Sequence, residues 1–269
     1  MLRVATYNIH RAVGADGRLQ PERTARVVLA LDADLVALQE VEMPALPSTR
    51  LLLSRFAAAG YRSLLGPTIG DERHGYGNVL LSRLPLLGCD RIDLSVPGRE
   101  PRGLVDAHFG PLSASNGAVD PPLDQGRRPR PHLRCLATHL GLSRGERQQQ
   151  IARIAALLDA APPSALGRAA DSDLDPAPPT QPVAHCRAPT LLLGDFNEWL
   201  PSRRLCPLDR RLRRAHTAAT WHARWPLLAL DRVWYRGLRL HHSRVRRDGA
   251  ARLASDHLPL LAQFEFLPP

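Results

Sequence analysis

The chain has 269 residues, of which 44% are hydrophobic and 23% charged, and its net charge at pH 7 is +10. Such values are typical of a folded protein with one large domain or two small ones, and they argue against a disordered chain. The apolar runs are too short to span a bilayer, and the first residues lack the pattern of a secretory signal. We therefore expect a cytoplasmic protein with no transmembrane segment.

The basic charge comes entirely from arginine, because none of the 36 Lys+Arg residues is a lysine. A basic surface is typical of proteins that bind nucleic acid or anionic lipid. The absence of lysine, together with 25 prolines, also fits a coding bias toward GC-rich codons, so the charge is weak evidence for either partner. The four cysteines are widely scattered, which predicts free thiols and argues against a zinc site.

The apolar patterns predict a mixed α/β architecture in which helices cover sheets. In chain order they indicate strand 2–7, helix 21–31, strand 34–40, helix 51–59, strand 78–82, strand 102–109, strand 133–138, helix 146–158, and strands 190–193, 230–235 and 258–266. Two proline-rich segments, 111–131 and 162–189, are predicted to be flexible surface insertions. We expect no domain boundary at either insertion, and therefore one domain over residues 1–269.

Polar side chains follow several predicted strands at the point where each strand ends. They are Asn8 and His10, Gln39 and Glu40, His139, Asp195 and Asn197, Asp231, and Asp256 with His257. Each alone is an ordinary turn or helix-cap residue. Strand ends in layered α/β folds converge on a crevice, however, and this set combines oxygen donors suited to Mg²⁺ or Mn²⁺ with histidines that can move protons. The pattern predicts metal-assisted phosphoryl chemistry.

Seven motifs resemble the endonuclease/exonuclease/phosphatase superfamily, which contains DNase I-like nucleases, abasic-site endonucleases, neutral sphingomyelinases and inositol polyphosphate 5-phosphatases. They are TYNIH (6–10), LQEVE (38–42), GNVLLSRLPL (77–86), ATHLGL (137–142), LLGDFNEW (192–199), LDRVW (230–234) and SDHLPL (255–260). They occur in the family's order from one end of the chain to the other. The resemblance implies a four-layer α/β sandwich: two mixed β-sheets packed face to face, helices outside, and an active site at one rim between the sheets.

The resemblance also implies a divalent metal site. Glu40 matches the principal metal-binding carboxylate, Asn8 lies beside it, and Asp256 matches a further metal-site carboxylate. Mg²⁺ is the expected ion on grounds of availability, with Mn²⁺ as the other choice.

The catalytic residues implied by the resemblance are His257, oriented by Asp231, and the pair Asp195 and Asn197, which position or activate the attacking water. His139 matches a second phosphate-facing residue. The implied mechanism is in-line attack of water on phosphorus. Whether Asp195 or His257 takes the water's proton stays open.

Three arginines are predicted to contact a substrate phosphate: Arg102 just before a predicted strand, and Arg144 and Arg147 at the start of the helix that follows His139. The leading substrate hypothesis is nucleic acid, which makes the protein a nuclease. The alternative is a phosphoesterase acting on a phospholipid, an inositol phosphate or another small phosphate ester, and an anionic lipid surface is a further candidate partner. A non-catalytic binding module is a third reading, and the intact set of carboxylates, amides and histidines argues against it. The sequence leaves the oligomeric state open.

Overall fold

The computed structural model describes residues 1–110, 133–160, 188–199 and 203–267. The predicted insertion at 111–131, and residues 162–187 of the second one, lie outside these ranges. Within them, no helix is long and apolar enough to cross a membrane. Among the described cysteines, the thiols of Cys89, Cys135 and Cys206 are free, as predicted.

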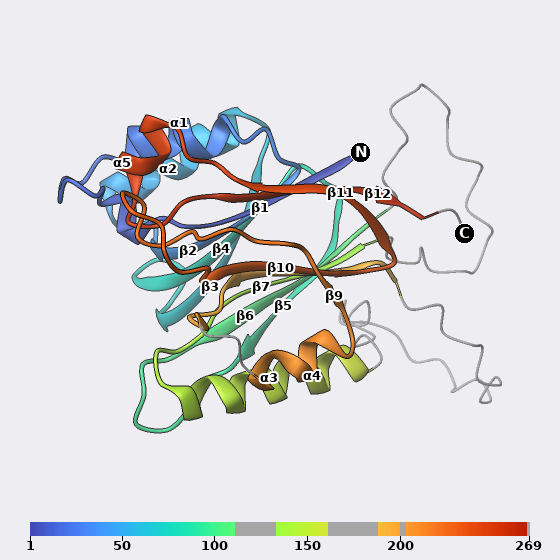
Figure 1. Cartoon of the computed structure of the whole chain (residues 1–269). Helices are drawn as coiled ribbons and strands as arrows, with labels where there is room; N and C mark the ends of the chain where they lie inside the picture. The colour runs from blue at the N-terminus through green and yellow to red at the C-terminus, as the bar shows by residue number, and fades with distance from the viewer. Residues whose placement is uncertain (111–132, 161–187, 200–202, 268–269) are drawn as a thin grey trace, which may run out of the picture.

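Two six-stranded sheets form the centre of the molecule (Figure 1). The first has the order β11 (Leu238–Val245), β12 (Leu260–Phe266), β1 (Leu2–Asn8), β2 (Leu35–Glu42), β4 (Gly75–Ser82), β3 (Arg62–Gly70). The second has the order β5 (Leu86–Asp93), β6 (Gly103–Phe109), β7 (Leu133–His139), β8 (Thr190–Asp195), β10 (Asp231–Arg236), β9 (Arg213–Arg214). Each sheet is mixed, because β1 pairs with β2 and β7 pairs with β8 in parallel, while the other pairings are antiparallel.

Helices cover the outer face of each sheet (Figure 1). The first sheet packs against α1 (Pro21–Leu29), α2 (Pro47–Ala58) and α5 (Gly249–Ala254), and the second against α3 (Arg144–Asp159) and α4 (Cys206–Asp209). Short 3-10 turns occupy His10–Ala12 and Arg203–Leu205. The order from one side to the other is helices, sheet, sheet, helices. The predicted four-layer sandwich is therefore confirmed.

The two sheets share an apolar core between their inner faces. In β2, Leu35 and Ala37 face the second sheet, whereas Val36 and Leu38 face the helices, and all four are fully buried. Successive side chains of a strand point to opposite faces, so a central strand of a sandwich covered by helices is apolar on both faces. This explains the continuous apolar runs that made the central strands visible in the sequence.

Candidate active site

The register of the second sheet places three of the predicted catalytic residues side by side. His139, the last residue of β7, pairs with Asp195, the last residue of β8, and Asp195 pairs in turn with Asp231, the first residue of β10. Gly194 makes this close approach possible, because a Cβ on it would meet the carbonyl oxygen of Thr138 at 2.0 Å. Three separate predicted strand ends thus meet at one edge of the sheet.

A β-bulge sets the direction of Glu40. The pairing of β2 with β4 shifts by one residue between Leu38 and Val41, and Glu40 has a φ of 56°. A left-handed backbone is uncommon outside glycine, and bulges commonly re-aim a side chain next to a functional site. Here the bulge interrupts the strict alternation of β2. The Glu40 carboxylate is left half-buried and accepts a hydrogen bond from Nδ2 of Asn8 at 2.9 Å.

Asp195 lies at the centre of the site. Its Oδ2 accepts a hydrogen bond from Nδ2 of Asn8 at 3.1 Å and lies 3.5 Å from Nε2 of His139 and 3.6 Å from Nε2 of His257. Asn8 belongs to the first sheet and Asp195 to the second, so the site spans the gap between the two sheets. The amide of Asn8 joins the carboxylates of Glu40 and Asp195, while its Oδ1 accepts from the backbone N–H of His10.

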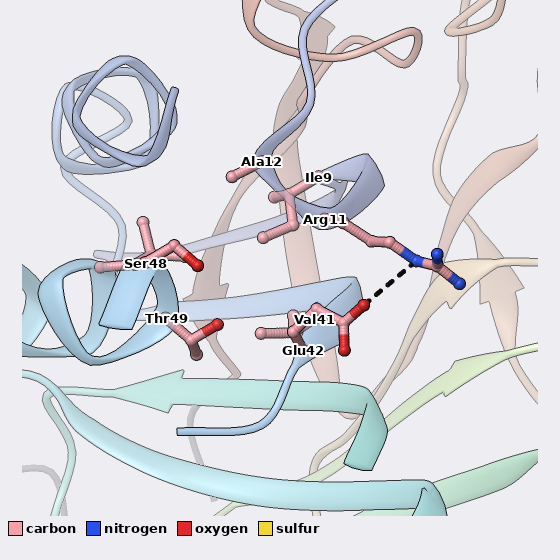
Figure 2. A pocket seen from close by; sticks show the side chains of 8 residues that line it. Ile9, Arg11, Ala12, Val41, Glu42, Ser48 and Thr49 are labelled. Atoms are coloured by element: carbon pink, nitrogen blue, oxygen red, sulfur yellow. Dashed lines mark ion pairs between the residues drawn. The ribbon is translucent and has the colours of Figure 1, made fainter. Parts of the chain in front are cut away.

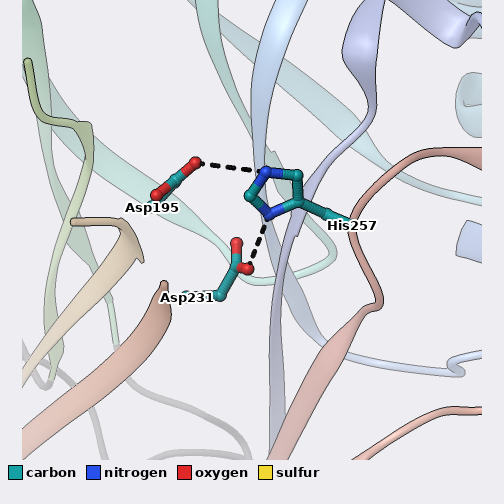
Figure 3. A group of neighbouring side chains, drawn as sticks. All are labelled: Asp195, Asp231 and His257. Atoms are coloured by element: carbon teal, nitrogen blue, oxygen red, sulfur yellow. Dashed lines mark hydrogen bonds and ion pairs between the residues drawn. The ribbon is translucent and has the colours of Figure 1, made fainter. Parts of the chain in front are cut away.

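His257 is held between two buried aspartates (Figure 3). Its Nδ1 lies 2.9 Å from Oδ2 of Asp231, which leaves Nε2 directed toward Asp195. The loop that carries it is fixed by Ser255, whose hydroxyl donates to the carbonyl of Asn8 and accepts from the backbone N–H of His257. A bonded carboxylate fixes both the tautomer and the orientation of an imidazole ring.

Asn197 also has a left-handed backbone, with a φ of 49°. Its backbone N–H donates to Oδ1 of Asp195 at 2.9 Å, and its Nδ2 donates to the carbonyl of Leu140 at 2.8 Å. The same Nδ2 lies 3.1 Å from Nε2 of His139. Residues in this backbone region persist when the surroundings hold them, and they concentrate at functional sites.

The electrostatics of the site follow from burial and from these contacts. Burial opposes protonation of His257, but the carboxylates of Asp231 and Asp195 outweigh it and raise the pKa of His257 to about 10. Burial lowers the pKa of His139, although Asp195 opposes that shift. Burial would raise the pKa of Asp195, yet the two neighbouring histidines hold it below its usual range. Asp195 is therefore an ionised carboxylate between two imidazoles.

The two carboxylates predicted to bind metal have the chemistry that a hard divalent cation needs. Glu40 and Asp256 are half-buried. Glu40 accepts a hydrogen bond from Asn8, and Asp256 accepts hydrogen bonds from the indole of Trp221 and the hydroxyl of Ser255. Oδ1 of Asp256 also lies 3.8 Å from Nδ1 of His10. Carboxylate oxygens are the preferred ligands of Mg²⁺ and Mn²⁺, so the residues present fit such an ion.

A second group of potential ligands lies nearby. The ligand atoms of Asp195, Asp231 and His257 come within 4.8 Å of one another. Oδ2 of Asp231 already bonds the imidazole, so these three residues form a hydrogen-bonded set rather than an open cage of oxygen donors.

Two cavities lie near these residues. One of about 10 Å³ is lined by Arg11 and Glu42, and Nε of Arg11 is 3.4 Å from Oε1 of Glu42 (Figure 2). Its volume suits one water molecule, so it is too small for a substrate. The other, of about 240 Å³, is lined by residues of β3, β5 and β6 and by Arg102.

The three predicted phosphate-binding arginines have different surroundings. Arg102 is 5% exposed, bonds Glu100 at 2.7 Å and directly precedes β6, whose Leu104 pairs with Thr138 next to His139. Arg144 is exposed at the start of α3. Arg147 is 3% exposed and uses its donors within the protein, on Glu198 and on the carbonyls of Gly141 and Leu142. We therefore leave Arg147 out of the proposed phosphate-binding residues.

Sequence reasoning missed three residues around the site. Trp221 forms a backbone bridge with His257 and bonds Asp256 at 3.2 Å. Tyr76 pairs with Glu42 across β2 and β4, and burial and the charge of Glu40 raise the pKa of its phenol. Glu198 follows Asn197 and is buried against arginines. Of these three residues, Glu198 alone had a signal in the sequence that pointed to the site: it directly follows Asn197 in the LLGDFNEW motif.

Known proteins share this fold and these motifs. The model of the "Endonuclease/Exonuclease/phosphatase family" matches residues 5–257. The uncharacterized protein YbhP of Escherichia coli (strain K12) is 28% identical over 280 residues, covering 97% of this chain and 95% of YbhP.

Two solved structures have the same fold. An endonuclease/exonuclease/phosphatase from Beutenbergia cavernae has a TM-score of 0.72 and 23% identity over 98% of this chain and 71% of its own. The mannosyl-6-phosphatase Bt3783 of Bacteroides thetaiotaomicron has a TM-score of 0.69 and 17% identity over 99% of this chain and 100% of its own. At these identities the structures show the fold alone. The family model, which spans nearly the whole chain, shows that this protein belongs to the endonuclease/exonuclease/phosphatase family, whose members hydrolyse phosphate esters.

Proposed function

We propose that the protein is a metal-dependent phosphoesterase that cleaves phosphodiesters by in-line attack of water. One observation carries the proposal: Oδ2 of Asp195 lies within 3.6 Å of Asn8, His139 and His257. Asn8 also bonds the half-buried carboxylate of Glu40, and half-buried Asp256 directly precedes His257. A single carboxylate oxygen is thus surrounded by polar groups from both sheets. A water or a phosphoryl oxygen placed there would meet all of them.

Glu40 and Asp256 would hold the divalent ion, which when bound supplies positive charge to the phosphoryl and leaving oxygens. Asn8 has a positioning role in this proposal, because its amide hydrogens bond Glu40 and Asp195 and its oxygen bonds the backbone of His10. In this proposal Asn8 therefore orients the neighbouring metal-binding carboxylate, Glu40.

The attacking water would lie against Asp195, which takes its proton. We favour Asp195 over His257 as the base because its Oδ2 is the atom on which the other polar groups converge. His257, held at Nδ1 by Asp231, presents Nε2 to the phosphoryl group and donates a hydrogen bond to it. His139 and Asn197, whose side chains lie 3.1 Å apart, bind the remaining phosphoryl oxygens.

Nucleic acid is the first substrate class that we propose. The support is the family, which includes nucleases by its name, and the net charge of +10, which favours a polyanion. Arg102, directly before β6, and Arg144, at the exposed start of α3, would contact phosphates next to the one cleaved. A solved structure of the same fold is a mannosyl-6-phosphatase, so a small phosphate ester stays an alternative.

A phospholipid is the second substrate class, and a specific observation favours it. Four large apolar side chains are exposed in loops next to site residues: Leu142 (73%), Trp199 (51%), Trp225 (79%) and Leu227 (82%). Trp225 and Leu227 are at the tip of a turn whose base, Trp221, pairs with His257. Tryptophan and leucine beside basic groups suit the interface of a bilayer, and leucine offers no ring on which a nucleobase can stack.

Replacing Trp225 and Leu227 together with serine separates the two classes. If the substrate is a lipid in a bilayer, binding to vesicles containing anionic phospholipid should fall at least tenfold, because burying each side chain contributes about 1.5–3 kcal/mol. Turnover of a soluble diester should stay unchanged. Leu46→Ser with Leu51→Ser, two exposed leucines at α2, is the matched control. Equal vesicle binding by both double variants and the wild type would remove the support for a lipid substrate.

Hydrolysis across a substrate panel, with and without a chelator, tests the proposed function. The panel contains plasmid DNA, single-stranded RNA, bis-p-nitrophenyl phosphate, phospholipid vesicles and inositol phosphates, each also incubated with Glu40→Ala. Cleavage of one class that requires both the metal and Glu40 is the expected result and identifies the substrate class. Cleavage that the chelator leaves intact would contradict the proposal.

A further inference from the structure

Glu198 is a buried carboxylate that the reaction proposed above does not use. Its side chain is 1% exposed, and it accepts hydrogen bonds from Nε of Arg147 at 3.2 Å and from Nε and Nη2 of Arg204 at 2.7 and 3.0 Å. Burial opposes its ionisation, but the two guanidinium groups hold the pKa of Glu198 below its usual range. Taking such a carboxylate out of water is costly unless it is paired and hydrogen-bonded, and here it is both.

Glu198 and the arginines around it connect the ends of three neighbouring strands: the loops that follow β7 and β8, and the first residues of β10. Arg147 also donates to the carbonyls of Gly141, at 3.2 Å, and Leu142, at 2.5 Å, in the loop after β7. The backbone carbonyl of Glu198, in the loop after β8, accepts from Arg232 of β10 at 2.7 Å. One buried ionic cluster therefore connects the ends of β7 and β8 with the start of β10.

Each of these segments carries a residue of the proposed site. His139 comes two residues before Gly141, Asn197 directly precedes Glu198, and Asp231 directly precedes Arg232. The hydrogen bonds of Arg147, Glu198 and Arg232 are therefore made within two residues of all three site residues. Because the backbone carbonyl of Glu198 is also bonded, to Arg232, both the side chain and the main chain of this residue are held next to Asn197.

The backbone conformation of Asn197 depends on surrounding contacts more than that of the residues next to it in the sequence. Its φ of 49° lies in the left-handed region, which asparagine tolerates better than most residues but which surrounding contacts normally hold in place. Those contacts include the bonds of its Nδ2 to Leu140 and His139, which cross from the loop after β8 to the loop after β7. Arg147 and Glu198 connect the same two loops a few residues further along.

We propose that Glu198, together with Arg147 and Arg204, is a positioning residue that holds Asn197 against His139 in the reactive geometry. The proposal rests on the proposed phosphoesterase function. Glu198 acts through Asn197 and not on the substrate, since its side chain is buried among arginines. Removing its charge should therefore impair the reaction after the substrate is bound and leave substrate binding nearly intact.

Steady-state kinetics of Glu198→Gln test this role. Supporting residues behind a catalytic group typically contribute 10- to 100-fold to activity, so we expect kcat to fall by about that factor while KM changes less than about threefold. Arg147→Gln removes the link to Gly141 and Leu142, leaves the bond between Arg204 and Glu198, and should also lower kcat. It serves as the second variant if Glu198→Gln does not fold.

The control is a second buried ion pair in the same sheet. Asp106 is 1% exposed and accepts three hydrogen bonds from Arg134, at 2.9, 3.1 and 2.5 Å. Arg134 is five residues before His139 along β7, roughly 16 Å away. Asp106→Asn should lower the unfolding temperature as much as Glu198→Gln does, with kcat within about twofold of the wild type. Equal kcat values for the two variants would overturn the positioning role.

A crystal structure of Glu198→Gln gives a readout that does not require turnover. We expect Asn197 to leave the left-handed region and its Nδ2 to lie more than 3.5 Å from Nε2 of His139. An unchanged contact between Asn197 and His139 would overturn the proposal. If the wild type cleaves no phosphate ester, the proposed function fails, and the crystal structure still decides whether Glu198 positions Asn197.

Discussion

Replacing His257 with alanine is expected to lower kcat about 1000-fold, measured on whichever ester the wild type cleaves. Proton transfer and hydrogen bonding by a positioned imidazole typically contribute 10²- to 10⁴-fold, and this ring is held by Asp231 at 2.9 Å with its other nitrogen toward Asp195. His242→Ala is the matched control, because that histidine is exposed on β11. Its kcat should equal that of the wild type.

The alanine variant leaves the fully buried Asp231 without its imidazole partner, which destabilises the fold. His257→Asn keeps a donor that can reach Asp231 and is the better folded test. It should lose activity to the same extent, because an amide cannot replace an imidazolium at the phosphoryl group. A folded His257→Asn protein with kcat within about threefold of the wild type would show that His257 takes no part in the reaction.

Asp195→Asn is expected to lower the single-turnover rate at least 1000-fold. The amide oxygen can still accept from the backbone N–H of Asn197, so the loop should keep its shape. What is lost is the charge that faces Asn8, His139 and His257, and with it the proposed acceptor of the water's proton. Asp34→Asn, at the far end of β2 from Glu40, is the control and should leave the rate unchanged. An equal rate for Asp195→Asn and Asp34→Asn would exclude Asp195 as the base.

The strands that sequence analysis predicted are the central ones, and those that it missed are the edges. In one sheet β11 and β3 are outermost, and in the other β5 and β9 are. None of these four was predicted as a strand. A central strand is buried on both faces and appears as an apolar run, whereas an edge strand keeps one side open to solvent and admits polar residues.

The two longer missed edges show this in their residues. β3 contains Gly66, Pro67 and Gly70, which are unfavourable inside a strand and are tolerated where one side of the strand has no partner. β11 carries His241, His242 and Arg244, and only Leu238 among its residues is fully buried. Neither segment has the apolar periodicity from which a strand is predicted. Their position becomes clear from pairing with β4 and β12.

Asn8, His139, Asp195 and Asp231 come together because each is the last or first residue of a central strand, and the sequence marks these strands clearly. The details depend on tertiary contacts. The left-handed conformation of Glu40 arises from a shift in pairing between β2 and β4, which no local pattern indicates. Arg147 is adjacent to a helix start, where an anion site is expected, but its guanidinium turns toward Glu198, far away in the sequence.

The most direct test of a metal-dependent phosphoesterase is a titration of activity with Mg²⁺ and Mn²⁺, using the wild type and Glu40→Gln after chelator treatment. The wild type should be inactive without added metal and recover in a saturable way. Glu40→Gln, which keeps the size of the side chain and loses its charge, should need at least tenfold more metal or recover less activity. Turnover by the chelated wild type, or identical metal curves for the two proteins, would contradict the assignment of Glu40 and the mechanism built on it.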